Sequence, residues 1–164
     1  VEFVFSDHRD AYVLERAEKL GIPSYAFELK EFESKADYER TIVELLDEHL
    51  IDLVCLAGYM KIIGPTLLAA YEGRIINIHP ALLPEFGGKG MYGAHVHRAV
   101  LEAGRSHSGI TIHLVDEDYD HGHHLLQATC PVHAGDTLET LANRVHELEH
   151  RFFAPTIAQY LRFL

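Results

Sequence analysis

Short apolar runs alternate along the chain with longer segments whose apolar residues recur every three or four positions. The apolar runs are bounded by turn residues and are predicted as strands at 1–5, 24–27, 52–57, 74–79, 109–115 and 125–132. The segments of helical spacing are predicted as helices at 10–20, 36–50, 65–71, 94–103 and 137–164. This alternation predicts an α/β fold with a doubly wound, mainly parallel sheet and helices on both faces.

The two ends of the chain add detail to this prediction. The loop between strands 109–115 and 125–132 is too short for a crossover helix, so these two are expected to form a C-terminal antiparallel pair. The chain opens directly in a strand, without an initiator methionine. We therefore expect a single domain over residues 1–164 that is incomplete at its N-terminus and lacks a first βα unit.

The strand at 74–79 carries two polar side chains that deserve a chemical interpretation. Successive side chains of a strand point to opposite faces, so Asn77 and His79 share one face. Pro80 and Pro84 end the segment, because proline cannot donate to a ladder and restricts the residue before it. His79 thus falls at the carboxyl end of the strand, where open α/β sheets bind ligands.

Composition excludes several classes of partner. The net charge is -11, with 14 Lys and Arg against 25 Asp and Glu, which argues against nucleic acid. No apolar run approaches the roughly 20 residues that span a bilayer, so no membrane partner and a cytoplasmic location are expected. The two cysteines, Cys55 and Cys130, lie in apolar segments and are expected to be reduced core residues.

Five sequence words, in order, resemble the phosphoribosylglycinamide formyltransferase family over nearly the whole chain. They are FSDHRDAYVLERAEKLGIP, DLVCLAGYMKII, NIHPALLPEF, SGITIHLVDEDYDHGHHLLQ and RVHELEH. The resemblance implies a Rossmann-like formyltransferase domain that acts on small molecules. It would transfer a formyl group from 10-formyltetrahydrofolate, the co-substrate, to the amine of glycinamide ribonucleotide in purine biosynthesis, without a metal.

The resemblance also implies catalytic roles for three residues. His79 matches the family's general acid, whose protonated imidazole would polarise the formyl oxygen. Asp120 matches a carboxylate that would stabilise the protonated imidazole, and Asn77 matches a neutral amide donor to the tetrahedral intermediate. Taken alone, each has a structural interpretation: a strand-end histidine is usually a structural side chain, and Asp120 could cap a loop.

Further positions match the family's binding residues. Those with an implied folate contact are Lys35, Met60, Lys61, Ile62, Ile63, Asn77, Asp116, Glu117, Asp118, Tyr119 and Asp120. Met60, Ile62 and Ile63 could instead pack a core, and Lys35 replaces a frequent arginine, which loses the bidentate fork. His146 and Glu149 match a helix at the ribose end of the nucleotide, where a carboxylate could accept from sugar hydroxyls. Glu149 could equally be an exposed helical acid.

Two features depart from the family pattern. The family holds the nucleotide phosphate with a Gly-Asn-Gly-Ser type loop after its first strand, and this sequence contains no such loop. The stretch Phe86 to His97 is longer than in the shortest family versions and rich in glycine, so it is expected to be flexible. Lys89 within it could offer charge to the phosphate.

Other functions remain open from the sequence. A formyltetrahydrofolate deformylase or a methionyl-tRNA formyltransferase would use the same three residues, although the acidic composition disfavours tRNA. Thirteen histidines, with clusters at His95 and His97 and at His121, His123 and His124, suggest a metal-binding module, but their spacing fits no familiar closed site. A non-catalytic remnant that binds folate or pairs with itself is a further alternative, and a homodimer is compatible with any of them.

Overall fold

The computed structural model describes all 164 residues, and their contacts gather into two compact units. The first unit comprises Val1–Asp52 with Ile63–Ala70, and the second comprises Leu53–Ile62 with Tyr71–Leu164. The prediction of a single domain is not tested by this division.

The first unit contains two short strands and three helices. They are β1 (Val4–Ser6), α1 (Tyr12–Lys19), β2 (Ser24–Ala26), the 3-10 turn η1 (Leu29–Glu31), α2 (Lys35–Glu48) and α3 (Pro65–Ala70). β1 and β2 pair in parallel, as the predicted βα alternation requires. The rings of Phe5, Phe27, Phe32 and Tyr38 pack against one another, with centroids 4.6 to 6.4 Å apart, and form an aromatic core between β1 and α2.

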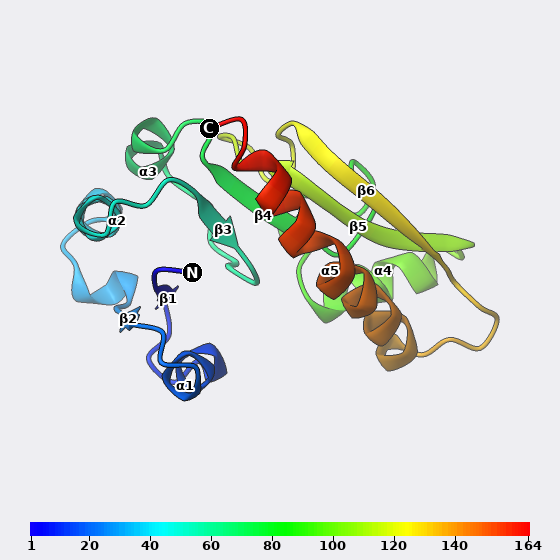
Figure 1. The fold of residues 1–164 in the computed structure, drawn as a ribbon. Coiled ribbons are helices and arrows are strands. Elements are labelled where there is room, and N and C mark those ends of the chain that lie inside the picture. Colours follow the sequence, from blue (N-terminus) through cyan, green and yellow to red (C-terminus); the bar gives the residue numbers. More distant parts are fainter. The chain divides into compact units, whose positions relative to one another are not determined.

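The second unit contains a four-stranded sheet and two helices. They are β3 (Val54–Leu56), β4 (Ile75–His79), α4 (Ala94–Glu102), β5 (His107–Leu114), β6 (His124–Pro131) and α5 (Leu138–Tyr160). The strand order is β3-β4-β5-β6, and α5 lies across β5 and β6 with α4 beside it (Figure 1). β3 and β4 are parallel, whereas β4 with β5 and β5 with β6 are antiparallel. The predicted C-terminal hairpin is confirmed, and antiparallel pairing begins one strand earlier than expected.

The two faces of this sheet have different chemistry. Alternate residues, among them Ile76, Ile110 and Ile112, are fully buried on one face, where they pack against Val100 of α4 and Val145 of α5. The pleat turns the intervening residues of β4 and β5 to the other face. One face of the sheet therefore packs against α4 and α5, and the other carries the polar side chains of β4 and β5.

The cysteines behave differently from each other. Both are free thiols, as expected, and Cys130 is buried in the core of the second unit. Cys55 is exposed, so its prediction as a core residue is wrong. The reason is that β3 is the outer strand of its sheet and has a neighbour on one side only.

The helices of both units lack the combination of length and apolar composition that a membrane-spanning helix requires.

A buried carboxylate holds α3 in the first unit. Glu39 of α2 is 3% exposed, and its carboxylate accepts hydrogen bonds from the backbone N–H of Gly64 at 2.6 Å and of Leu67 at 3.4 Å. The ammonium of Lys35 lies 3.6 Å from the same carboxylate. The N-terminus of α3 thus receives a negative charge, which satisfies two of its free N–H groups. A Cβ on Gly64 would lie 2.3 Å from Oε1 of Glu39, so the site also requires glycine there.

We expect Glu39→Ala to lower the free energy of unfolding by about 2 to 3 kcal/mol, since hydrogen bonds to a buried charged acceptor are lost. Urea denaturation measures the change. Glu44→Ala, at an exposed position of the same helix, is the matched control and should be within about 0.5 kcal/mol of the wild type. Equal stability of the two variants would show that the buried carboxylate does not hold α3.

Candidate active site

Four polar residues meet on the face of the second unit's sheet that is opposite α4 and α5. Asn77 and His79 of β4 lie directly opposite His113 and Thr111 of β5 in the antiparallel register. Residues opposite each other in such a pair have their Cβ atoms about 5 Å apart on the same face. The predicted common face of Asn77 and His79 is therefore confirmed, and β5 contributes two further side chains to it.

His79 is held at both ring nitrogens. Its Nε2 lies 2.8 Å from the backbone carbonyl of Phe86, and its Nδ1 lies 3.4 Å from Oδ1 of Asp120. A carbonyl oxygen can only accept, so Nε2 must carry a proton and donate it to Phe86. The remaining nitrogen, Nδ1, faces a carboxylate. The side chain of His79 is 4% exposed, so both contacts are shielded from water.

His113 was not identified from the sequence. Its Nδ1 lies 2.8 Å from the carbonyl of Leu114, which places the proton of the neutral ring on Nδ1 and a lone pair on Nε2. That lone pair accepts from Nδ2 of Asn77 at 3.1 Å, and Nε2 is 3.7 Å from Oδ1 of Asp120. A register shift between β5 and β6 falls at Ile112 and His113, and bulges of this kind re-aim side chains next to functional sites.

Asp120 brings the other residues together. Its backbone has a φ of 53°, in the left-handed region that aspartate tolerates better than most residues. Oδ2 accepts from the N–H of Gly88 at 2.9 Å, while Oδ1 faces Nδ1 of His79 and lies 3.5 Å from Nδ2 of Asn77. Burial opposes ionisation, but the imidazole of His79 and the hydrogen bond from the N–H of Gly88 outweigh it and hold the pKa of Asp120 well below its usual range. Asp120 is therefore a carboxylate at neutral pH.

The loose contacts of Oδ1 show what the site can do chemically. Three nitrogen atoms, from His79, Asn77 and His113, surround this oxygen at 3.4 to 3.7 Å, longer than a good hydrogen bond. The second hydrogen of the Asn77 amide points to Oδ1, since the first is donated to His113. The arrangement offers a donor from His79 and a donor from Asn77 to another oxygen that enters beside Asp120.

The sequence-predicted binding residues have different environments. Met60 is 59% exposed, and Tyr119 is 39% exposed in the loop that leads to Asp120. Asp116 holds that loop: it accepts from the N–H of Asp118 at 3.0 Å and pairs with His121 at 2.8 Å. Besides Asn77 and Asp120, the exposed and half-buried residues of the second unit with an implied folate contact are Met60, Lys61, Ile62, Asp116, Glu117, Asp118 and Tyr119.

Two of the predicted residues belong to the first unit. Ile63 is 5% exposed and is part of its core, as the alternative interpretation of this position expected. Lys35 forms the ion pair with Glu39. Contacts of these two residues with a folate remain predictions.

α5 contributes a second group of ionisable side chains. His146 and Glu149 lie one turn apart, with Nε2 and Oε2 separated by 4.0 Å. Burial raises the pKa of Glu149, and the nearby imidazoles of His146, His150 and His79 oppose that shift.

His97 of α4 is 3% exposed, and its Nδ1 has no hydrogen-bond partner. Burial lowers the pKa of His97, so it is neutral at pH 7.

Two of the residues that were not predicted from the sequence lie in a recognisable pattern. Thr111 and His113 alternate with Ile110 and Ile112, the pattern of a strand with one polar face, and it could have identified both. The carbonyl of Phe86 has no such signal, because a backbone group in a loop is placed by the fold and not by its residue type. No group of three or more His, Cys, Asp or Glu residues is arranged to hold a metal ion.

The chain is similar to several known proteins. A family model described as formyl transferase matches residues 1–157. A phosphoribosylglycinamide formyltransferase of Bacillus subtilis is 47% identical over 155 residues, which cover 94% of this chain and 77% of that protein. A trifunctional purine biosynthetic protein of Gallus gallus is 40% identical over 93% of this chain, which covers only 15% of that protein. The crystal structure of phosphoribosylglycinamide formyltransferase from Streptococcus pneumoniae superimposes with a TM-score of 0.92 at 60% identity, covering 98% of this chain and 87% of that one.

We expect His79 and His113 to hold opposite tautomers when neutral, with the proton on Nε2 of His79 and on Nδ1 of His113. Nitrogen-15 NMR of histidine-labelled protein distinguishes the two ring nitrogens, and His79→Asn and His113→Asn assign the signals. A proton on Nε2 of His113 would show that its lone pair does not accept from Asn77.

Proposed function

The chain belongs to the formyl transferase family, and we propose that it transfers the formyl group of 10-formyltetrahydrofolate to the amine of glycinamide ribonucleotide in purine biosynthesis. It is then a phosphoribosylglycinamide formyltransferase. The observation that carries this proposal is the convergence of Asn77 and His79 of β4 on Asp120 of a distant loop, with a nitrogen of each within 3.5 Å of Oδ1 of Asp120.

The reaction has two requirements that this group meets. The amine nitrogen attacks the formyl carbon, a C–N bond forms, and the formyl oxygen gains a negative charge. The bond from that carbon to the folate nitrogen then breaks, and the proton lost by the amine ends on the folate nitrogen. A site for this chemistry needs donors for the oxygen and a group that moves the proton.

His79 and Asn77 supply the donors. Nε2 of His79 is engaged with Phe86, so the proton available to a substrate is the one on Nδ1, on the side of Asp120. The second hydrogen of the Asn77 amide points to the same side. Both donors are loosely held in the free protein and can tighten on a formyl oxygen, as catalytic hydrogen bonds commonly do when substrate binds.

Asp120 supplies the charge that makes the proton transfer workable. The pKa of Asp120 lies well below its usual range, so a negative charge stands beside the imidazole when it takes up a proton. Because Oδ2 is fixed by the N–H of Gly88, Oδ1 keeps its position next to His79 while the proton moves.

Two further groups of residues in the second unit have side chains that suit the two substrates. The exposed side chains of Met60 and Tyr119, with the backbone of the Asp116 to Asp120 loop, suit the flat pteridine of the folate. Glu149, flanked by His146, has carboxylate oxygens that suit the hydroxyl groups of the ribose. By the family resemblance, Ile63 would contact the pteridine and Lys35 the folate tail, and Lys89 would offer its charge to the phosphate.

The function is tested by a spectrophotometric assay of deformylation with 10-formyltetrahydrofolate, with and without glycinamide ribonucleotide. We expect deformylation only when the amine is present, together with a formylated nucleotide as product. Release of formate at the same rate without the amine would instead identify a hydrolase that uses water as the acceptor.

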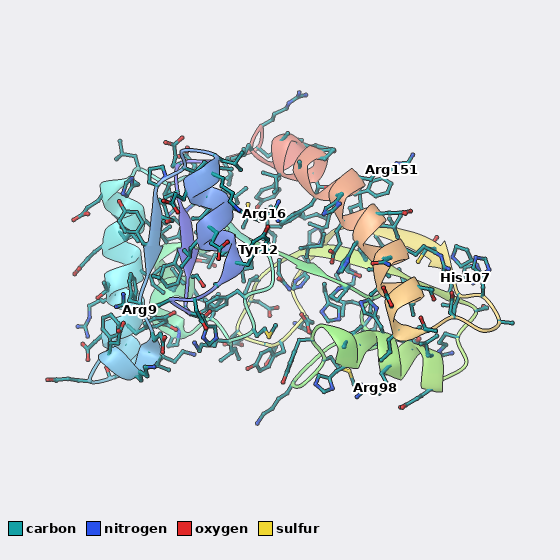
Figure 2. All side chains as sticks on the ribbon, turned by 90° about the horizontal axis from the view of Figure 1, so that it is seen from below. Arg9, Tyr12, Arg16, Arg98, His107 and Arg151 are labelled. Atoms are coloured by element: carbon teal, nitrogen blue, oxygen red, sulfur yellow. The ribbon has the colours of Figure 1, made fainter.

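We expect His79→Asn and Asp120→Asn each to lower kcat by about 10² to 10³, the loss typical of a removed oxyanion donor, with little change in unfolding. His107→Asn is the control, because His107 lies on the same strand as His113 but at its far, exposed end (Figure 2). It should retain wild-type kcat. Unfolding of His79→Asn or Asp120→Asn at room temperature would instead show that the substituted residue is needed for the fold.

A further inference from the structure

A second polar network lies beside the proposed catalytic group and touches none of the reacting atoms. Thr111 is fully buried directly opposite His79 in the sheet, and Gln127 of β6 is directly opposite Thr111. The three residues therefore form a row across three strands. Gln127 is exposed at the outer strand, so the row runs from the surface to the site.

The Thr111 hydroxyl and the Gln127 amide nitrogen form four hydrogen bonds, three of them to backbone groups. The Thr111 hydroxyl donates to the carbonyl of Ala81 at 2.7 Å and accepts from the N–H of Leu83 at 3.0 Å. The Gln127 amide donates to the same hydroxyl at 2.9 Å and to the carbonyl of Leu83 at 2.9 Å. Three backbone groups of the loop after β4 are thus bound by two side chains, and buried groups of this kind would be costly to leave unpaired.

The loop that is held in this way is the one that orients His79 and Asp120. The side chain of Leu83, 5% exposed, packs against Gly87 so closely that a Cβ there would lie 2.5 Å from Cδ2 of Leu83. On either side of Gly87, the carbonyl of Phe86 accepts from His79 and the N–H of Gly88 donates to Asp120. Phe86 has a φ of 56°, an unfavourable conformation that its surroundings must maintain.

We propose that Gln127 and Thr111 are positioning residues, which fix the loop from Ala81 to Gly88 and through it set the orientation of the His79 ring toward the formyl group. The inference rests on the proposed function for its kinetic consequence only. A small displacement of the Phe86 carbonyl would turn the imidazole and move its Nδ1 proton away from the acceptor, and such misplacement is expensive for catalysis.

The test uses Gln127→Leu, which keeps the size of the side chain and removes both donors at an exposed position. We expect kcat to fall about tenfold, equivalent to ~1.4 kcal/mol, with both KM values within twofold and an altered pH profile of kcat. The NMR signal of the His79 Nε2 proton, which is shared with Phe86, should shift or broaden. Thr111→Ser keeps the hydroxyl and should match the wild type.

Thr129→Val is the matched control, since Thr129 is exposed on β6 and points to the same face as Gln127. It should leave kcat and the pH profile unchanged. The proposal is overturned if Gln127→Leu keeps the wild-type kcat and His79 signal, or if kcat and melting temperature fall together in both Gln127→Leu and Gln127→Glu. If the wild type shows no amine-dependent transfer, the proposed function fails, while the His79 signal still decides the positioning role.

Discussion

The register between β4 and β5 is the constraint on which the whole site depends. It sets Asn77 opposite His113 and His79 opposite Thr111, all on the face that the core does not use. A shift of one residue would turn every one of these side chains to the opposite face and bring the buried isoleucines to the site. The hydrophobic contact of Ile76, Ile110 and Ile112 with α4 and α5 therefore specifies the polar face as firmly as the core.

The charge of Asp120 is stabilised by hydrogen-bond donors and by the imidazole of His79. Burial alone would favour its neutral form, yet the imidazole of His79 and the hydrogen bond from the Gly88 N–H outweigh burial. No arginine or lysine takes part in these contacts. Distant basic residues add little: Arg98 extends from α4 and Arg151 from α5, on separate parts of the unit's surface (Figure 2). Among the groups within 3.5 Å of the Asp120 carboxylate, only the imidazole of His79 can take up and release a proton near neutral pH. His79 is therefore the group that can carry the proton of the reaction.

The sequence predicted the fold class, the order of the elements and the face that carries Asn77 and His79, because alternation along a strand is a local property. Asp120 came only from the family resemblance, since nothing within its loop shows that it reaches a strand 41 residues earlier. His113 carried a readable pattern and was missed. Phe86 could not have been found, because its contribution is a carbonyl whose direction follows from a loop held by other residues.

The contact lengths divide the work around His79 between two groups. The bond to the Phe86 carbonyl, at 2.8 Å, is short and defines how the ring is turned, whereas the contact with Asp120, at 3.4 Å, is loose. A ring bound tightly at both nitrogens could orient a proton but could not release it. A tight neutral acceptor on one side and a loose charged one on the other keeps the ring in place and leaves the Nδ1 proton free to move. For the same reason the support of the loop, at Thr111 and Gln127, can affect catalysis without touching either substrate.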